Sequence, residues 1–431
     1  MKRILFARRT YGFGGTEVIL LDWLKRIDYS AYDVFVCSPR DVFSKAVSDA
    51  GLPAKIVHLS EEEILRIYGR YRPAEGIIDL VQGSFWHYFP IWLGFLKSLK
   101  PDEVVFLDGD FFTTPLACVL AAYVVTKGNV SMTIHSPAKL EPPLQKKTKI
   151  RFGFLPDFGL WWYPRVSWPL WPWKLRARLS KRILMASSSI KSRIERFYGY
   201  PTAKTGLVGH GVDTGAFRPS LLKRRRYRRQ NEIPDDAFVI VSTSRLSAEK
   251  RVERVIKAFE EIARKDERVW LLLAGDGPLK TDVENSIAKC ESRERVKLIG
   301  HVDDVAPVLQ AADAYVLPSE FEARTIALAE AMAVGLICLA SNIPGPDEMI
   351  EDGHDGFLID PSTSGVVAGL QKVLALPASE RDKVSANARK KVEDKFELEN
   401  AVQDAFAKLE IASPEHRQRA LQYLRERKSQ A

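Results

Sequence analysis

The sequence contains little cysteine and little histidine. Among its 431 residues there are four cysteines and seven histidines, and the cysteines lie far apart in mostly apolar surroundings. Such cysteines are typical of reduced core residues in a cytosolic protein, so we expect neither a disulfide framework nor a metal cluster. The histidines show no metal-ligand spacing either.

Long hydrophobic segments are also missing. The longest apolar run, residues 115–125, is shorter than the roughly 20 residues that a helix needs to cross a bilayer. The apolar run before Arg8 has only four residues, which is too short for a signal peptide. Because 46% of the residues are hydrophobic and 28% are charged, the composition is that of a soluble globular protein, which we expect to be cytoplasmic.

Basic charge, in contrast, is abundant and concentrated. The formal net charge is +9; residues 139–182 hold eleven Lys and Arg against two acidic residues, and residues 223–229 hold six against none. Basic patches on an otherwise acidic body indicate a specific anionic partner. We interpret residues 223–229 as solvated surface, with contact to a membrane as the alternative.

Apolar runs of strand length alternate with helical segments in the first half of the chain. The length fits two or three domains, and the alternation predicts a mostly parallel, doubly wound sheet. A glycine-rich turn with Gly14 and Gly15 follows the first strand and precedes a helix over residues 18–27, a favourable place for an anion. Glycines also simply permit tight turns. The expected strands are residues 3–7, 34–37, 55–59, 77–81, 104–107 and 130–134.

Two carboxylates, Glu322 and Glu330, stand eight residues apart in the second half. Glu322 follows an apolar strand over residues 313–317, and Glu330 lies in an apolar helix over residues 326–334. Open α/β sheets bind ligands at such strand ends. A carboxylate in so apolar a helix needs a hydrogen-bond donor, which a ligand hydroxyl would supply. A structural salt bridge is the alternative.

Several motifs around these carboxylates occur in a recognisable order. Pro318-Ser319, Glu322 and Glu330-Ala331-Met332 resemble the Glu-x7-Glu signature of retaining GT-B glycosyltransferases of family 4, the group 1 type. The resemblance covers most of the chain and is strongest from about residue 208 to residue 361. The other matching motifs are His210-Gly211-Val212-Asp213, Ser244-Arg245-Leu246 with Lys250, Leu273-Ala274-Gly275, Ile299-Gly300-His301-Val302 and Asp352-Gly353-x-Asp355-Gly356.

This resemblance implies an α/β fold of the GT-B type, with two Rossmann-like doubly wound domains facing a central cleft. We expect an acceptor-binding domain over residues 1–205, with an insertion at about 140–182, and a nucleotide-sugar-binding domain over residues 206–395. C-terminal helices over residues 396–431 would cross back to the first domain. The family moves a hexose from a UDP- or GDP-sugar to an acceptor hydroxyl, with retention at the anomeric carbon and without a metal or other cofactor.

The resemblance also implies roles for single residues. Arg245 and Lys250 bind the donor diphosphate, whose growing charge must be neutralised; Glu322 contacts the donor sugar and Glu330 the ribose hydroxyls. His135 faces the reacting sugar, unless it is only bonded to its own loop. We thus expect catalytic roles for Glu322, His135, Lys250 and Arg245. Further donor contacts are expected at Gly14, Gly15, Gly275, His301, Val302, Ala323, Arg324, Thr325 and Ile326, with His301 and Val302 beside the nucleobase.

Two features depart from known patterns. The family usually has Gly-Phe-Gly after its first Glu, where this chain has Ala323-Arg324-Thr325. Glycine allows a close approach of the backbone to the donor that other residues hinder. The identity of the donor sugar therefore stays open, and Arg324 becomes a candidate contact to a phosphate or an acid. Asp108-Gly109-Asp110 imitates the metal-binding Asp-x-Asp of the GT-A fold, but it ends a strand of the first domain, and we do not expect a metal there.

Residues 146–182 combine five of the nine tryptophans with prolines and cations. Aromatic rings and cations together are typical of an anchor at an anionic membrane surface, and residues 174–181 could form a short basic helix there. Alternatives are a packed loop, an acceptor-binding lid, or base stacking, although nothing else indicates nucleic acid. The expected membrane or acceptor contacts are Trp161, Trp162, Trp168, Trp171, Trp173, Arg165, Lys174, Arg176 and Arg178.

The preferred hypothesis is therefore a glycosyltransferase on the inner face of the cytoplasmic membrane. Its acceptor would be a lipid-linked saccharide in bacterial polysaccharide or lipopolysaccharide synthesis. Two alternatives stay open: the same enzyme acting on a soluble acceptor, and a non-catalytic nucleotide-sugar or membrane-binding protein that lost turnover through the Ala323-Arg324-Thr325 change.

Overall fold

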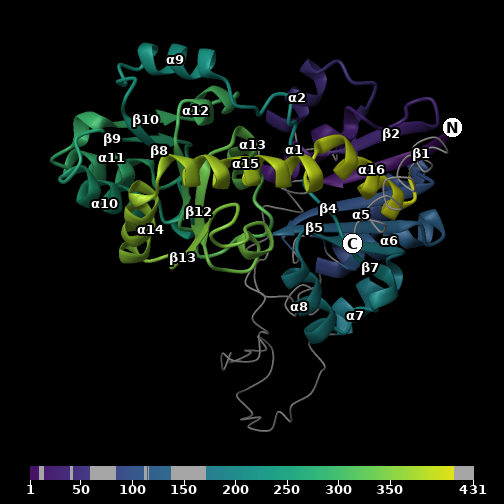
Figure 1. Cartoon of the computed structure of the whole chain (residues 1–431). Coiled ribbons are helices and arrows are strands. Elements are labelled where there is room, and N and C mark those ends of the chain that lie inside the picture. Colours follow the sequence, from purple (N-terminus) through teal and green to yellow (C-terminus); the bar gives the residue numbers. More distant parts are fainter. Residues whose placement is uncertain are drawn as a thin grey trace, which may run out of the picture. The chain divides into compact units, whose positions relative to one another are not determined.

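The computed structural model describes residues 1–8, 14–38, 42–58, 84–110, 114, 116–136 and 171–411. The chain divides into two compact units, which we treat separately (Figure 1). Among the described residues, unit 1 comprises Met1–Val208 together with residues 406–411, and unit 2 comprises Gly209–Ala405. The division at Val208 lies near the boundary expected at residue 205.

Unit 1 contains a seven-stranded sheet in the order β3-β2-β1-β4-β5-β6-β7, and all of its paired strands are parallel. Parallel neighbours need crossover connections, which helices provide. The strands are β1 (Lys2–Arg8), β2 (Tyr32–Cys37), β3 (Lys55–Val57), β4 (Glu103–Asp110), β5 (Val130–Ser136), β6 (Arg182–Met185) and β7 (Thr205–Leu207). The helices are α1 (Gly15–Leu24), α2 (Val42–Asp49), α5 (Ser84–Leu99), α6 (Leu116–Thr126), α7 (Trp171–Leu179) and α8 (Ser188–Tyr198).

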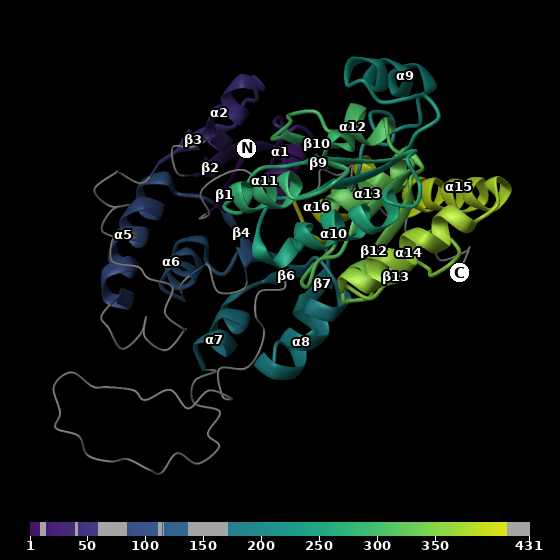
Figure 2. The same ribbon diagram turned by 90° about the vertical axis from the view of Figure 1, so that its left-hand side faces the viewer.

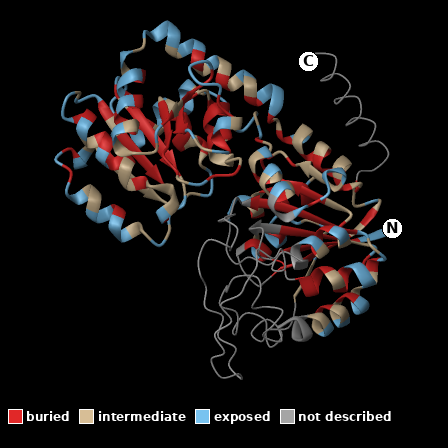
Figure 3. Cartoon of the chain, turned by 90° about the horizontal axis from the view of Figure 1, so that it is seen from below, coloured by how far each residue is buried: buried red, intermediate tan, exposed pale blue. Residues whose placement is uncertain are grey.

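The core of unit 1 is the sheet itself, which Figure 3 shows as buried strands. Strands covered on both faces need apolar residues at successive positions, and this explains why the sequence has continuous apolar runs here instead of alternation. Trp23 of α1 packs edge to face on Phe6, with ring centroids 6.3 Å apart, and on Phe406, at 5.9 Å. The aromatic cluster therefore joins the start of the chain to its returning end.

Unit 2 contains a six-stranded parallel sheet in the order β10-β9-β8-β11-β12-β13. The strands are β8 (Phe238–Thr243), β9 (Val269–Ala274), β10 (Val296–Gly300), β11 (Ala314–Leu317), β12 (Ile337–Ser341) and β13 (Phe357–Ile359). The helices are α9 (Leu221–Gln230), α10 (Val252–Ala263), α11 (Lys280–Ala288), α12 (Ala306–Gln310), α13 (Ile326–Val334), α14 (Thr363–Ala375), α15 (Ala378–Lys395) and α16 (Leu398–Leu409), whose end belongs to unit 1.

Two apolar clusters cover the two faces of this sheet. One joins the strands to α13 and α15, and the other joins them to α10 and α14 (Figure 2). Helix α13 is apolar on almost all sides, which is the pattern of a helix that is buried all round, and most of its residues are indeed buried. It ends where Gly335 adopts a left-handed conformation, with φ of +81°.

The strand order creates a reversal point in unit 2. From β8 the chain proceeds through β9 to β10 at one edge, and it then returns to β11 and proceeds to β13 at the other edge. The loops after β8 and β11 consequently leave neighbouring strands in opposite directions. Ligands of open parallel sheets bind where two loops diverge in this way.

Most of the expected elements agree with the structure. The helix over residues 326–334 has the expected bounds, and two parallel, doubly wound sheets are confirmed. All four cysteines are buried. The strand expected at 77–81 and a last helix after residue 413 lie outside the described residues. Among the helices that are described, none is both long enough and apolar enough to cross a membrane.

Candidate active site

The loops at the carboxyl ends of the strands in unit 2 lie directly on one another. A Cβ atom on Gly275, after β9, would lie 1.9 Å from the carbonyl oxygen of Ser244, after β8. A Cβ atom on Gly345, after β12, would lie 2.2 Å from the carbonyl oxygen of Ala323, after β11. Both glycines also have positive φ, so only glycine fits there without displacing the backbone.

An ion pair joins the loop after β8 to the loop after β11. The Nζ atom of Lys250 lies 2.6 Å from Oε1 of Glu322, and the Glu322 side chain is only 7% exposed. A carboxylate buried to this degree requires a hydrogen-bond donor, and Lys250 provides it. The structure thus brings together two of the residues that the sequence predicted to be functional, at the reversal point between β8 and β11.

Glu320, which the sequence did not single out, adds further contacts between the loops after β8 and β11. Its backbone N–H donates to the carbonyl oxygen of Glu249 at 2.9 Å, and its carboxylate lies 2.8 Å from nitrogens of Arg251 and Arg254. Hydrogen bonding from Arg251 lowers the pKa of Glu320. Arg251 has a φ of +51°, which is uncommon for a residue other than glycine. These contacts hold Lys250 and Glu322 opposite each other, yet nothing local in the sequence distinguishes Glu320 from an ordinary surface carboxylate.

Tyr315 of β11 lies buried beneath the two carboxylates. Its hydroxyl donates to the carbonyl oxygen of Thr243 at 3.3 Å. Burial raises the pKa of Tyr315 well above its usual range, and the charges of Glu322 and Glu330 raise that pKa further. The phenol group of Tyr315 therefore stays protonated at neutral pH.

Three buried hydroxyl groups lie at the same ends of β8 and β11. The side-chain oxygens of Ser242, Thr243 and Ser319 have no hydrogen-bond partner among the described residues, and Ser319 is fully buried. Buried polar groups are normally paired, since leaving one unpaired costs free energy. Because Ser242 and Thr243 are consecutive in β8, their side chains face opposite sides of the sheet, and a polar ligand or ordered water on one side would satisfy only one of the two.

Arg324 is the residue that departs most from the family pattern. Its guanidinium lies 5.6 Å from the ring centre of Phe396 and 3.8 Å from the carboxylate of Glu348. The side chain is thus held between a ring and an acid of unit 2, at the start of α13. Ala323 is buried, Thr325 is the N-cap of α13, and Ile326 is its first residue.

The remaining donor-site candidates in unit 2 are less enclosed. Arg245 is exposed at the start of the loop after β8, and Glu330 is half-buried within α13. His301 and Val302 follow β10, two strands from β8. The His301 side chain is 71% exposed, 3.6 Å from Asp303, whereas Val302 packs partly on the core.

Unit 1 contains the predicted glycine turn, where the structure adds an unexpected acid. Gly14 is the N-cap of α1, which begins at Gly15, earlier than expected. The N–H of Gly14 donates to Oε2 of Glu17 at 2.9 Å, and Oε1 of Glu17 accepts from Nε of Arg8 at 2.8 Å. Part of the anion-binding capacity of this helix start is therefore used by the protein's own carboxylate.

His135 lies at the end of β5 in unit 1 and is only 7% exposed. Its Nε2 atom lies 2.8 Å from the hydroxyl of Thr133, two residues earlier in the same strand. Burial lowers the pKa of His135 to about 4, so its imidazole is neutral near pH 7. His135, Gly14 and Gly15 thus belong to a different unit from Lys250 and Glu322.

The structure describes only part of the predicted membrane surface. Trp161, Trp162, Trp168 and Arg165 lie outside the described residues, as do the side chains of Trp171 and Trp173. Lys174 and Arg178 of α7 are exposed, in agreement with a surface role. Arg176 differs from these two residues: it is buried in unit 1, 1% exposed, and its Nη2 lies 3.8 Å from the sulfur of Met132.

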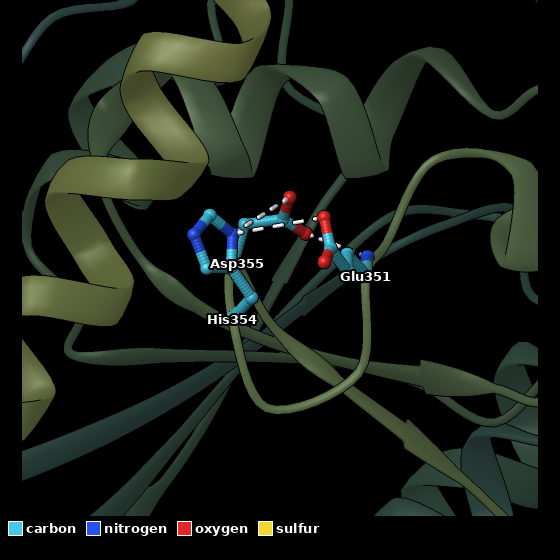
Figure 4. Close-up of side chains that lie close together, drawn as sticks. All are labelled: Glu351, His354 and Asp355. Atoms are coloured by element: carbon cyan, nitrogen blue, oxygen red, sulfur yellow. Dashed lines mark hydrogen bonds and ion pairs between the residues drawn. The ribbon is translucent and has the colours of Figure 1, made fainter.

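One cluster of possible metal ligands lies in the turn between β12 and β13. Figure 4 shows Glu351, His354 and Asp355 close together. Oδ2 of Asp355 is 2.5 Å from Nζ of Lys391, and Oδ1 accepts the N–H of Glu351 at 2.8 Å. Since Lys391 already supplies a positive charge to the one buried carboxylate, we interpret this cluster as a turn stabilised by an ion pair.

Two parallel doubly wound units, one with charged loops at its reversal point, define the GT-B fold. A solved structure from Anabaena, Alr3699/HepE in complex with UDP-glucose, matches this fold with a TM-score of 0.71 at 17% sequence identity. The match covers 96% of this chain and all of that one. Residues 223–391 match the model of the family "Glycosyl transferases group 1". The part of the chain that is similar to this family thus lies within unit 2.

Curated proteins give the same family relation. The chain is 26% identical over 250 residues to alpha-D-kanosaminyltransferase of Streptomyces kanamyceticus, covering 56% of this chain and 63% of that protein. It is 28% identical over 269 residues to UDP-Gal:alpha-D-GlcNAc-diphosphoundecaprenol alpha-1,3-galactosyltransferase of Escherichia coli, covering 61% and 64% respectively. The matched part therefore spans less than two thirds of either relative.

Proposed function

We propose that this protein transfers a sugar from a nucleotide diphosphate sugar to an acceptor hydroxyl, with retention at the anomeric carbon and without a metal ion. The observation that supports this most is the contact of Lys250 with Glu322, at the reversal point of unit 2. A cation and a carboxylate there match the two halves of a nucleotide sugar, an anionic diphosphate and a hydroxyl-bearing ring.

In the proposed reaction, the bond between the anomeric carbon and the diphosphate oxygen breaks and its electron pair stays on the diphosphate. The acceptor oxygen forms the new bond to that carbon on the same face, and its proton passes to the departing diphosphate. Lys250 and Arg245 neutralise the charge that grows on the leaving group, the task that preorganised cations perform best. Lys250 must turn from Glu322 toward the phosphates for this purpose.

The carboxylates would hold the two sugars of the donor. Glu322, freed from Lys250, accepts hydrogen bonds from the transferred sugar, and Glu330 accepts them from the ribose. The first N–H groups of α13, from Ile326, point to the same loop and favour the diphosphate through the helix dipole. His135 of unit 1 is neutral at neutral pH, so any role it has is that of an uncharged hydrogen-bonding group.

For the acceptor, we propose a lipid-linked saccharide at the cytoplasmic face of a bacterial membrane. Two observations support this choice: the name of the E. coli relative specifies a diphosphoundecaprenol-linked acceptor, and residues 146–182 combine tryptophans with cations. A soluble acceptor is the competing proposal, and transfer to water-soluble saccharides but not to lipid extracts would favour it.

A donor panel tests this proposal. Thermal unfolding is measured with UDP-, GDP- and ADP-sugars, followed by transfer assays on lipid extracts and soluble saccharides. A true donor present at a hundred times its Kd stabilises the fold by about 2.7 kcal/mol. If the sugars of one nucleotide stabilise the fold and transfer is also observed, the result supports the proposed glycosyltransferase. Stabilisation without turnover on any acceptor supports a nucleotide-sugar-binding protein, and no stabilisation at all contradicts both.

A further inference from the structure

Helix α9 is the basic segment that the sequence analysis interpreted as solvated surface, and the structure shows that two of its arginines point inward. Arg224 donates to the carbonyl oxygen of Ala312 at 2.6 Å and to Oδ1 of Asp313 at 2.7 Å. Arg228 is 1% exposed and donates to the carbonyl oxygen of Ala311 at 2.9 Å and to Oδ2 of Asp313 at 2.8 Å. These two arginines, one helical turn apart, fix one side of α9 to the sheet.

The opposite side of α9 faces away from unit 2. Figures 1 and 2 both show the helix beside α12, at the rim of the unit. Leu221 is 75% exposed and Leu222 is 80% exposed; few large apolar side chains in the described part of the chain are as exposed. The other exposed side chains of the helix are Lys223, Arg225, Arg226, Arg229 and Gln230.

The exposed side chains of α9 comprise four cations and two leucines and include no acid. Leu221, at the start of the helix, lies on the same stripe as Arg224 and Arg228, three and seven residues before them. Residue spacing along a helix places Leu222, Arg226 and Arg229 on neighbouring parts of the side opposite Arg224 and Arg228. Leucine side chains that insert between headgroups, with cations that meet anionic phosphates, are the composition of a helix that lies on a membrane. Nucleic acid would favour exposed aromatic rings, but Tyr227, the aromatic residue of α9, is half-buried.

We propose that the exposed surface of α9, formed by Leu221, Leu222, Lys223, Arg225, Arg226 and Arg229, binds the surface of an anionic phospholipid bilayer. The partner chemistry is a lipid phosphate headgroup over an apolar layer. This surface lies in unit 2 and is separate from the tryptophan-rich residues of unit 1, so it stands independently of the proposed sugar transfer.

The position of α9 keeps such binding apart from the candidate active site. Asp313 and the carbonyl groups bound by Arg224 and Arg228 precede β11, at the amino ends of the strands. Lys250 and Glu322 follow β8 and β11 at the carboxyl ends, a strand length of roughly 15–20 Å away. The protein can therefore lie on a membrane through α9 while its nucleotide-sugar loops stay accessible.

The test is co-sedimentation of the full chain with phosphatidylcholine vesicles, with and without one third of phosphatidylglycerol. One variant changes Lys223, Arg225, Arg226 and Arg229 to Gln, and a second changes Leu221 and Leu222 to Ser. The matched control changes four exposed lysines of unit 2 to Gln and so removes the same charge elsewhere: Lys257, Lys265, Lys289 and Lys383. Arg224 and Arg228 are left unchanged, because they hold the helix in place.

We expect the α9 charge variant to lose at least about tenfold in partitioning to anionic vesicles, given that each cation near such a surface contributes about fivefold. The leucine variant should lose the binding that persists at high salt, and the control should bind as the wild type does. All variants should retain the wild-type melting temperature. Equal losses in the α9 charge variant and the control would overturn the proposal, since they would reflect net charge alone.

A local probe decides whether α9 itself meets the lipid. Leu222→Cys, labelled with an environment-sensitive fluorophore, should shift to the blue on anionic vesicles, whereas Lys289→Cys with the same label should not. The native cysteines are buried and do not compete for the label. An unchanged spectrum at residue 222 during vesicle binding overturns the proposal. So does a shift that appears with polyuridylic acid and not with vesicles, which would make the partner a nucleic acid.

Discussion

The two ends of the sheet in unit 2 hold charged groups in opposite ways. At the amino ends, the carboxylate of Asp313 accepts from Arg224, Arg228 and the N–H of Val239, at 2.7–2.8 Å. At the carboxyl ends, Lys250 and Glu322 have one close contact with each other, while neighbouring hydroxyl groups lack partners among the described residues. The first end is complete without a ligand, and the second is not.

This difference separates structural charge from functional charge within one unit. An acid such as Asp313, whose two carboxylate oxygens accept three hydrogen bonds, stabilises the fold. A single pair such as Lys250 with Glu322 can be exchanged for ligand contacts, because each partner would find a replacement on a nucleotide sugar. Substitutions at the amino ends should therefore change stability, and substitutions at the carboxyl ends should change catalysis.

The largest effect is expected at Lys250. Lys250→Ala should lower kcat/KM of transfer about a thousandfold, because the leaving diphosphate loses its main cation. It should also lower the melting temperature, since Glu322 is left buried without a partner. The double variant Lys250→Ala with Glu322→Gln should recover the melting temperature and remain inactive. Recovery of activity in the double variant would mean that the pair is structural.

Asp313 should show the reverse behaviour. Asp313→Ala leaves two arginines and a backbone N–H without their acceptor, and we expect a loss of about 2 kcal/mol in the free energy of unfolding, measured with urea. The Kd for the nucleotide sugar should not change. Asp382→Ala, at an exposed position of α15, serves as the control and should leave stability almost unaltered. A higher Kd for the nucleotide sugar in Asp313→Ala would show that the two ends of the sheet are coupled.

Glu330 offers a finer test of the carboxyl ends. Glu330→Ala should weaken donor binding about tenfold. This is the usual effect of removing a charged group that accepts hydrogen bonds from hydroxyl groups, here those of the ribose. Glu330→Gln, which keeps one carbonyl acceptor, should lose less. Calorimetric titration with the nucleotide alone measures the Kd of both variants. The nucleotide contains the ribose but not the transferred sugar, so the titration reports the ribose contact. An unchanged Kd in both variants would remove Glu330 from the donor site.

The smallest effect is expected at Glu103, an acid at the amino end of a strand in unit 1. Its Oε1 atom has no hydrogen-bond partner among the described residues. Burial raises the pKa of Glu103, the first residue of β4, to about 7, and Lys181 and Lys2 offset only part of this. Its ionisation therefore opposes folding, and stability falls as the pH rises from about 4.5 to 7. Glu103→Gln should be more stable than the wild type at pH 8, with the difference vanishing below pH 4.5. Thermal melts across this range measure it, and a constant difference would contradict the assignment.

The sequence was sufficient for most of the fold. Continuous apolar runs identified the buried strands, and the bounds of α13 could be predicted because Gly335 marks its end. The order of motifs also placed Lys250 and Glu322 at one site, where the structure brings them to 2.6 Å. Such features are local, and local patterns are what a single sequence displays.

The contacts that sequence reasoning missed connect distant parts of the chain. Arg228 meets Asp313, 85 positions later, and so a residue from an apparently solvated charge run is buried. Arg254 meets Glu320, 66 positions later. Glu17 was missed for another reason: it reaches the N–H of Gly14 only because α1 begins at Gly15. Charge alone cannot tell a surface residue from one that a distant partner buries.

The central claim is that the loops after β8 and β11 bind the diphosphate of a nucleotide sugar. A crystal structure of the protein with the donor identified by the panel tests it most directly. We predict that Nζ of Lys250 leaves Oε1 of Glu322 and lies within hydrogen-bond distance of a phosphate oxygen, with Glu330 on the ribose. A donor bound elsewhere, with Lys250 and Glu322 still paired at 2.6 Å, would contradict the account.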